Sequence, residues 1–353
     1  MKFLIIALSG IGDALMYTPV ITQLKKENPN IEIDALVMFK GVKDMYSRMN
    51  EIDNVHYFDF MNSSASKVLK TVLSFRKKYD HSVSIYPSNR KEYNLIQFLI
   101  GAKKRAGVKY LRKGKENLYW LNNIVITEDD SLHNVETNIK LTEKLFDIKF
   151  TDSPELNFPL VNEDLEFADN YFLKNSISET DLVIGFHAGC ATLKNHIKRR
   201  WAPEKFAQLG KKLIFEKNAK ILIFGGPEEE ELKTNIINQI DSKHSFSVNS
   251  DNLTQSAAVM KRCNIFVSND SGLMHIASAL QLKVAALIGP TNPNYIHPWK
   301  TEHRIVSNNL ECAPCFYYSP KHLSCSRNDT QFKCIKELEV QKAFKAVIEL
   351  MNS

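Results

Sequence analysis

Asp270, Ser271, Gly272 and His275 form a segment whose residue types suit the binding of an anion. A short apolar run, 265–267, ends just before them, and apolar residues at helical spacing begin at Gly272. This pattern predicts a buried strand, a tight turn and a helix with Ser271 as its N-cap. The first amides of such a helix can donate to a phosphate, and His275 lies one turn further along. An ordinary strand-to-helix turn is the alternative that this segment alone leaves open.

A second acidic turn follows the apolar run at the start of the chain, in the segment SGIGDALMYTP. Gly10 and Gly12 could open a dinucleotide-binding fingerprint, but Leu15 occupies the third glycine position and the fingerprint fails. Asp13 then stands out. A carboxylate near a helix N-terminus can simply compensate the helix dipole, or it can act as a general base at a strand end. Both interpretations remain open from the residues.

Cationic side chains follow a third strand-like run, and they fit a pyrophosphate because arginine offers a bidentate fork. These side chains are Lys194, Lys198, Arg199 and Arg200. The alternative is a solvated basic loop in which Trp201 anchors the core. A fourth loop, GGPEEEE, places four glutamates near a helix start. Most of them are expected to be surface charges that the helix dipole favours, and one of them could accept hydrogen bonds from a ribose.

Four clustered cysteines have the spacing C-x2-C-x9-C-x8-C, and they are Cys312, Cys315, Cys325 and Cys334. Clustered thiols in a cytoplasmic chain suggest a metal site more than disulfides. Four thiolates would satisfy a tetrahedral zinc or iron ion and leave no position open for catalysis. The expected role is therefore structural. Free thiols and disulfides are the alternatives.

The elements that must position these residues alternate between strand and helix, which predicts parallel α/β architecture. Strands are expected at 2–8, 31–37, 55–60, 82–86, 182–187, 220–224, 265–267 and 284–288. Helices are expected at 18–27, 66–78, 203–217, 228–240, 253–261 and 337–351. The polar stretch 151–164 separates two doubly wound domains. Ligands of such sheets bind beyond the carboxyl ends of the strands, where all the loops above would lie.

Length and charge agree with this organisation. A chain of 353 residues usually folds as two domains. The net charge of +6 favours anionic small molecules or an anionic membrane surface over nucleic acid. The run FLIIAL near the N-terminus spans six residues, so a first strand is expected and not a signal peptide. No apolar run approaches the roughly 18 residues of a membrane span. A cytoplasmic protein is therefore expected.

Five segments together, LSGIGDALMYTP, RRW, GGPEEEE, SNDSGLMHIA and IGPTNP, occur in the order and spacing of glycosyltransferase family 9. The chain resembles that family, which contains the bacterial heptosyltransferases of lipopolysaccharide core assembly. The resemblance implies a GT-B fold with two Rossmann-like domains facing across a cleft. Residues 1–160 would bind the acceptor, 161–335 would bind the nucleotide-sugar donor, and 336–353 would form a helix packing back on a domain.

The resemblance also implies roles for individual residues. Asp13 matches the catalytic base of the family. Glu229 aligns with a glutamate that contacts the donor ribose, and Arg199 stands where well-known members carry a lysine on the donor phosphate. The remaining donor-binding expectations are Lys194, Lys198, Asp270, Ser271, Gly272 and His275.

The implied reaction is an inverting transfer of heptose from ADP-heptose to an anionic glycolipid or glycan acceptor of the lipopolysaccharide-core type. No cofactor is required for it. The basic run Lys103–Lys115 could contact the inner face of the inner membrane, although a solvated face explains it equally well. The alternatives keep the fold but change the nucleotide-sugar, use a protein acceptor as in autotransporter heptosylation, or leave a non-catalytic binding protein.

Overall fold

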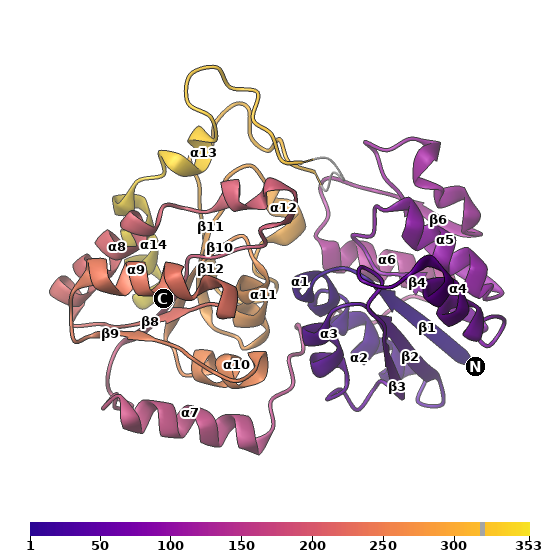
Figure 1. The fold of residues 1–353 in the computed structure, drawn as a ribbon, viewed down its shortest axis with the longest axis horizontal. Coiled ribbons are helices and arrows are strands. Elements are labelled where there is room, and N and C mark those ends of the chain that lie inside the picture. The colour runs from indigo at the N-terminus through magenta and orange to yellow at the C-terminus, as the bar shows by residue number, and fades with distance from the viewer. Residues whose placement is uncertain (318–321) are drawn as a thin grey trace. The chain divides into compact units, whose positions relative to one another are not determined.

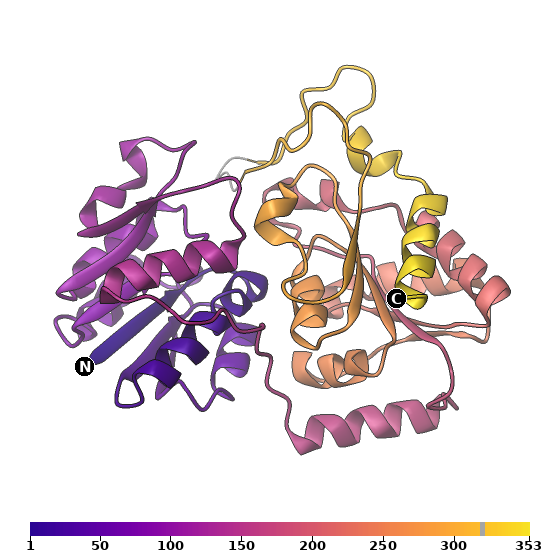
Figure 2. The same ribbon diagram turned by 180° about the vertical axis from the view of Figure 1, so that it is seen from behind.

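The structure is a computed structural model that describes residues 1–317 and 322–353, without the side chains of Leu193 and Lys194. The chain forms two compact units. The N-terminal unit comprises Met1–Pro159, and the C-terminal unit comprises Leu160–Tyr317 together with 322–353. Each unit has a parallel sheet with helices on both faces (Figures 1 and 2). The prediction of doubly wound parallel sheets is confirmed.

The N-terminal unit has the strand order β3-β2-β1-β4-β5-β6, with every neighbouring pair parallel. Its strands are β1 (Lys2–Ala7), β2 (Glu32–Val37), β3 (Asn54–Tyr57), β4 (His81–Ser84), β5 (Lys104–Lys109) and β6 (Ile124–Thr127). Its α-helices are α1 (Ile11–Leu15), α2 (Thr18–Glu27), α3 (Lys40–Tyr46), α4 (Ala65–Ser74), α5 (Lys91–Ile100) and α6 (Asn134–Phe146), and its 3-10 turns are η1 (Lys115–Asn117) and η2 (Tyr119–Leu121).

Strand β1 is apolar at nearly every position because both of its faces are buried. Leu4 and Ile6 belong to a core that includes Val72 of α4 and Ile96 of α5. Phe3 points to the other face, where its ring makes an edge contact with Phe146 of α6 at 5.1 Å between centroids. The unbroken apolar run therefore marks a central strand covered on both sides.

The C-terminal unit repeats the architecture with the order β12-β11-β10-β7-β8-β9. Its strands are β7 (Val183–His187), β8 (Lys220–Phe224), β9 (Ser245–Ser247), β10 (Ile265–Asn269), β11 (Lys283–Leu287) and β12 (His303–Val306). Its helices are α7 (Asn162–Lys174), η3 (Leu193–Arg199), α8 (Pro203–Lys217), η4 (Pro227–Glu229), α9 (Glu230–Ile240), α10 (Leu253–Lys261), α11 (Gly272–Ala279), α12 (Pro293–Ile296), α13 (Lys333–Lys336) and α14 (Val340–Met351).

The expected helices at 18–27, 203–217 and 253–261 form within the expected bounds. Strands β5, β6, β9 and β12 were missed by the sequence prediction. Strand β5 begins in the basic run, and only its central residues, such as Ala106 and Val108, are buried. A strand with a charged start and a short apolar centre lacks the longer apolar run that would predict it from the sequence.

The single final helix predicted over 337–351 is wrong at its start. The chain forms α13, then breaks, and resumes as α14. The carbonyl of Leu338, between the two helices, accepts hydrogen bonds from Trp201 Nε1 at 2.8 Å and from Lys205 Nζ at 2.8 Å. These tertiary hydrogen bonds use a carbonyl that a continuous helix would have paired internally.

Among the described residues, no helix combines the length and the apolar character needed to cross a bilayer.

Candidate functional site

The strand order of the C-terminal unit brings the loops with unusual residues to one edge of its sheet. The chain runs outward from β7 through β8 to β9, and then crosses over to β10, β11 and β12 on the other side. The order therefore reverses between β7 and β10, and the crevice beyond their carboxyl ends is the usual ligand position in such a sheet. His187 ends β7, and Asp270 directly follows β10.

Asp270 is buried at this edge and is held from two sides. Its Oδ2 accepts a hydrogen bond from Arg199 NH1 at 2.5 Å and another from Thr291 Oγ1 at 2.6 Å. Arg199 also lies over the ring of Phe316, 5.5 Å from its centroid. The carboxylate thus joins the turn after β10 to the loops that follow β7 and β11.

Ser271 occupies the N-cap position of α11, as predicted. Its side chain does not cap the helix, and no cap hydrogen bond from it is found among the described residues. Its Oγ lies instead 2.9 Å from His187 Nδ1 and 3.1 Å from Ser268 Oγ. The side chain is drawn back towards the sheet, while Gly272 begins the helix.

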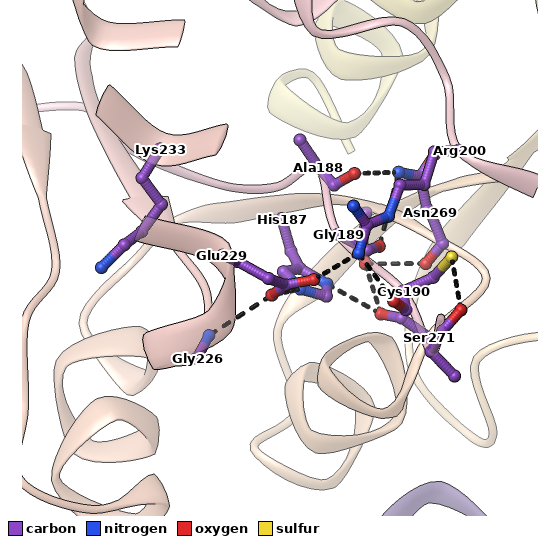
Figure 3. Close-up of polar contacts among 12 residues, drawn as sticks. His187, Ala188, Gly189, Cys190, Arg200, Gly226, Glu229, Lys233, Asn269 and Ser271 are labelled. Atoms are coloured by element: carbon purple, nitrogen blue, oxygen red, sulfur yellow. Dashed lines mark hydrogen bonds and ion pairs between the residues drawn. The ribbon is translucent and has the colours of Figure 1, made fainter. Parts of the chain in front are cut away.

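Glu229, at the end of η4, is the second buried carboxylate of the site (Figure 3). Its Oε1 accepts from Arg200 NH2 at 2.9 Å, and its Oε2 lies 3.1 Å from His187 Nε2 and accepts from the amide of Gly226 at 3.3 Å. Burial alone would raise the pKa of Glu229, but the hydrogen bond to His187 and the charge of Arg200 lower it below the ordinary value. Glu229 is therefore ionised at neutral pH.

Gly189 is required by the position of Glu229. A Cβ on this residue would collide with the Glu229 carboxylate. Asn269 then fixes the same loop, because its Nδ2 donates to the carbonyl of Ala188 at 2.7 Å and its Oδ1 accepts from the amide of Trp201 at 3.0 Å. Trp201 is fully buried and anchors the core, as expected from the alternative interpretation of the basic loop.

His275, one turn into α11, is buried as well. Burial lowers its pKa to about 4, against the opposing influence of Asp270, so the ring is neutral at neutral pH. Its Nδ1 has no hydrogen-bond partner among the described residues. The Nε atoms of Arg199 and Arg200 also lack partners in that part of the chain. Three buried nitrogens of this cluster therefore have no hydrogen-bond partner in the described part of the chain.

The remaining cations of the prediction are placed differently. Lys198 is exposed on η3, whereas its neighbour Arg199 is buried. The side chain of Lys194 lies outside the described part of the structure. His187, Asn269 and Thr291 were not among the predicted site residues, and Arg200 was predicted only as one of the cations of its loop. Their positions near the ends of strands could have indicated a role in the site. His187, for example, is the last residue of a predicted strand.

Asp13 lies in the N-terminal unit, in the first turn of α1, and is half-buried. The amide of Ala14 donates to the carbonyl of Gly10 at 3.1 Å and so closes this turn. Nearby, Tyr93 donates its hydroxyl to the carbonyl of Leu8 at 2.9 Å. Burial raises the pKa of Tyr93, Arg90 opposes the increase, and Asp13 adds to it. Asp13 therefore lies among charged and hydroxyl groups at the end of β1.

The structure does not support the metal site predicted at the four cysteines. Among the described residues, no three side chains of His, Cys, Asp or Glu are arranged to hold a metal ion. Cys312 and Cys315 are exposed, whereas Cys334 is buried. Burial and the neighbouring thiols raise the pKa of Cys334 to about 11, so it is a protonated thiol at neutral pH. Cys325 Sγ accepts a hydrogen bond from the amide of Phe332 at 3.2 Å.

Two six-stranded parallel Rossmann-like units define the GT-B fold, which known structures share. The E. coli ADP-heptose lipopolysaccharide heptosyltransferase II superposes with a TM-score of 0.74 at 21% identity, covering 100% of this chain and 99% of its own. The E. coli heptosyltransferase WaaC with ADP-2-deoxy-2-fluoro heptose superposes with a TM-score of 0.66 at 18% identity, covering 100% of both chains.

Sequence comparison assigns the chain to a family. The model of glycosyltransferase family 9 (heptosyltransferase) matches residues 77–324, more than half of the chain, and the chain belongs to this family. It is therefore a glycosyltransferase. Lipooligosaccharide heptosyltransferase 2 of Haemophilus influenzae is 29% identical over 318 residues, which cover 87% of this chain and 88% of that protein.

Proposed function

We propose that the protein transfers heptose from an ADP-activated donor to an acceptor of the lipopolysaccharide-core type. The observation that carries the proposal is the buried cluster at the switch point of the C-terminal sheet. There, Arg199 and Arg200 lie beside the N-terminus of α11 and keep unpartnered Nε atoms among the described residues. The names of relatives support the sugar, because the H. influenzae protein is a lipooligosaccharide heptosyltransferase.

The donor would bind through its diphosphate and its ribose. The first amides of α11 and the two arginines suit the diphosphate, because they combine a helix dipole with guanidinium donors. Glu229 would accept a hydrogen bond from the ribose. Its carboxylate has about four acceptor positions, and His187, Arg200 and Gly226 occupy three of them. One acceptor position therefore remains for a ribose hydroxyl.

Asp13 would serve as the general base. It takes the proton from an acceptor hydroxyl while the oxygen of that hydroxyl attacks the anomeric carbon of the donor. The bond between this carbon and the diphosphate breaks on the opposite face, so the configuration inverts and ADP leaves. The amides of Ser271 and Gly272, with Arg199, would stabilise the negative charge that develops on the departing diphosphate. Domain closure would exclude water during the step.

Nucleotide binding is the first test of this proposal. Isothermal titration of the purified protein with ADP, UDP, GDP and NAD should show the tightest binding for ADP. Tight NAD binding without affinity for ADP would contradict the donor assignment. Product analysis by mass spectrometry with ADP-heptose then separates a glycolipid acceptor, which we expect to be modified, from a protein acceptor.

The transfer would require no metal ion, because arginines and backbone amides provide the positive charge. Activity should therefore be the same with and without EDTA. A loss of activity in EDTA that is restored by Mg²⁺ or Mn²⁺ would contradict this part of the proposal. The cytoplasmic location and the contact of Lys103–Lys115 with the inner membrane remain predictions.

A further inference from the structure

Positive charge is concentrated in one part of the N-terminal unit. Residues 61–123 contain 14 Lys and Arg against three Asp and Glu, a net charge of +11, whereas the whole chain carries +6. The other residues together are therefore negative. Most of the 14 cations are exposed, on or near α4, α5 and β5. Lys103 pairs with Asp80, and Arg112 pairs with Asp130. A charge of this size within one segment attracts an anionic surface.

Exposed apolar side chains lie among these cations. Helices α4 and α5 pack side by side on one face of the N-terminal sheet (Figure 1). Where they end, the amide of Lys77 donates to the carbonyl of Ile100 at 2.9 Å. Val72 and Ile96 are buried in the core beneath both helices. A surface helix normally presents polar residues to solvent, but here further apolar side chains are exposed. They are Leu69 and Leu73 of α4, and Leu95 and Phe98 of α5.

Trp120 of η2 extends this surface. Segment η2 packs against α5, and Arg105 joins the two. The guanidinium of Arg105 lies over the ring of Phe98, 5.6 Å from its centroid, and its Nε donates to the carbonyl of Leu121 at 3.3 Å. Trp120 is 56% exposed, and its Nε1 donates to the carbonyl of Lys115 at 3.3 Å. We call Leu69, Leu73, Leu95, Phe98 and Trp120 the apolar patch. An exposed patch of this kind marks an interaction surface.

We propose that the apolar patch and the cations around it dock the protein on an anionic lipid bilayer. The apolar side chains would leave water at the level of the headgroups, and the long Lys and Arg side chains would reach the lipid phosphates. Exposed tryptophan beside cations is typical of the membrane interface. Nucleic acid fits less well, because its phosphates would attract the cations but leave the exposed leucines in water. The surface includes the basic run Lys103–Lys115 and adds both helices to it.

Docking has a consequence for the acceptor that rests on the proposed function. Helix α5 contacts the end of β1, because Tyr93 on its first turn donates to the carbonyl of Leu8 at 2.9 Å. Asp13 follows in α1, directly after that strand end. A bilayer bound at the apolar patch would therefore lie against the same unit as the proposed base. The class of acceptor that fits this arrangement is a glycan carried on a membrane lipid.

Tryptophan fluorescence tests the docking directly. Of the three tryptophans, Trp120 alone is exposed, since Trp201 is fully buried and Trp299 is 9% exposed. Vesicles of phosphatidylcholine and phosphatidylglycerol in a 3:1 ratio should move the emission to shorter wavelength at about 0.1 M salt. Vesicles of phosphatidylcholine alone should not. Trp120→Phe should still sediment with the anionic vesicles but lose the shift. Failure to bind anionic vesicles, or binding without a shift, overturns the proposal.

The cations are tested by a pair of double variants. Lys67→Gln with Lys70→Gln neutralises two exposed residues of α4 and should weaken vesicle binding by at least about tenfold, because each cation near an anionic surface contributes roughly fivefold. Lys211→Gln with Lys217→Gln is the matched control, since both lysines are exposed on α8 of the other unit. It should bind as the wild type does. Equal losses in both would show that only overall charge matters.

The apolar contribution has its own control. Leu69→Ser with Phe98→Ser should weaken binding to the anionic vesicles by about tenfold or more. Phe215→Ser is the matched change, because Phe215 is 91% exposed on α8. Its binding should equal that of the wild type. Circular dichroism establishes that each variant is folded, and Trp120→Phe decides the question if the double variant is not. Full binding by a folded Leu69→Ser, Phe98→Ser variant overturns the role of the apolar patch.

The failures of the two proposals are distinguishable. Vesicle binding needs neither donor nor acceptor, so its absence overturns the docking and leaves the proposed function untouched. ADP affinity and heptose transfer in detergent test that function without a bilayer. Duplex DNA that binds as tightly as the anionic vesicles and displaces them would assign the surface to nucleic acid and overturn the choice of partner.

Discussion

The regions that follow β1 and β10 share a local sequence pattern, but their aspartates have different surroundings. Each joins a buried apolar strand to a helix through glycine and aspartate. Asp270 is 6% exposed, and both Arg199 and Thr291 donate to the same carboxylate oxygen. Asp13 is half-buried in a helix of five residues. The comparison teaches that tertiary partners, and not the local motif, make Asp270 a structural anchor, whereas the role of Asp13 as a base is a proposal.

Replacing the proposed base, Asp13, should have the largest effect. Asp13→Asn keeps the shape of the side chain but cannot take a proton, so kcat should fall by about 10²- to 10⁴-fold. Affinity for ADP should stay within about twofold, since the nucleotide would bind the other unit. Steady-state kinetics and calorimetry on the same preparation measure both. Turnover equal to the wild type would remove Asp13 from the mechanism and end the functional contrast between the two turns.

Replacing the anchor should instead affect folding. Asp270→Asn leaves the buried Arg199 guanidinium without its charged partner, which costs roughly 3–5 kcal/mol of unfolding free energy. Denaturant unfolding of the full chain measures this. Asp169→Asn is the control, because its ion pair with Arg262 is largely exposed and should contribute under about 1 kcal/mol. Equal stability of the two variants would show that Asp270 is not an anchor.

Adding a methyl group should have different effects in the two units. Gly189→Ala would force the Glu229 carboxylate to move, at an overpacking cost of about 1–3 kcal/mol, and should weaken ADP binding by about tenfold. Gly10→Ala is the counterpart before α1, where a Cβ would meet no described atom within 4 Å. Its ADP affinity should match that of the wild type. If both variants bind ADP normally, Glu229 does not position the donor.

The smallest effect concerns acid stability of the N-terminal unit. Asp34 accepts hydrogen bonds from Tyr79 Oη at 2.6 Å and Asn54 Nδ2 at 2.9 Å. Burial alone would raise the pKa of Asp34, but His56, Tyr79 and Asn54 lower it below 3.8. The stabilisation is therefore present above that value and is lost as the pH falls through the folded pKa.

Unfolding free energies measured between about pH 5 and about pH 3 should show this loss, of about 1 kcal/mol or less. The Asn variant at position 34 should lack it. An identical pH dependence in wild type and Asp34→Asn would show that this carboxylate contributes nothing to acid sensitivity.

The sequence alone determined the alternation of strands and helices, because burial on both faces forces apolar runs such as those of β1 and β10. It also predicted where ligands would bind, since loops that follow parallel strands share one edge. It did not reveal β5 or the break before α14. Strand β5 has charged ends and only a short buried centre, and the break depends on hydrogen bonds from Trp201 and Lys205 to the carbonyl of Leu338.

The pairing of charges was decided only by the tertiary structure. The sequence places Arg199, Arg200, Glu229 and Asp270 in loops that follow strands, but it does not show how they pair. Arg200 pairs with Glu229, 29 positions away, and Arg199 pairs with Asp270, 71 positions away. His187 carried no motif, and the cysteine spacing indicated a metal site that is not found among the described residues. Spacing along a chain limits which groups can meet, whereas hydrogen-bond geometry and burial depend on packing between distant segments, and these determine the charge of each group.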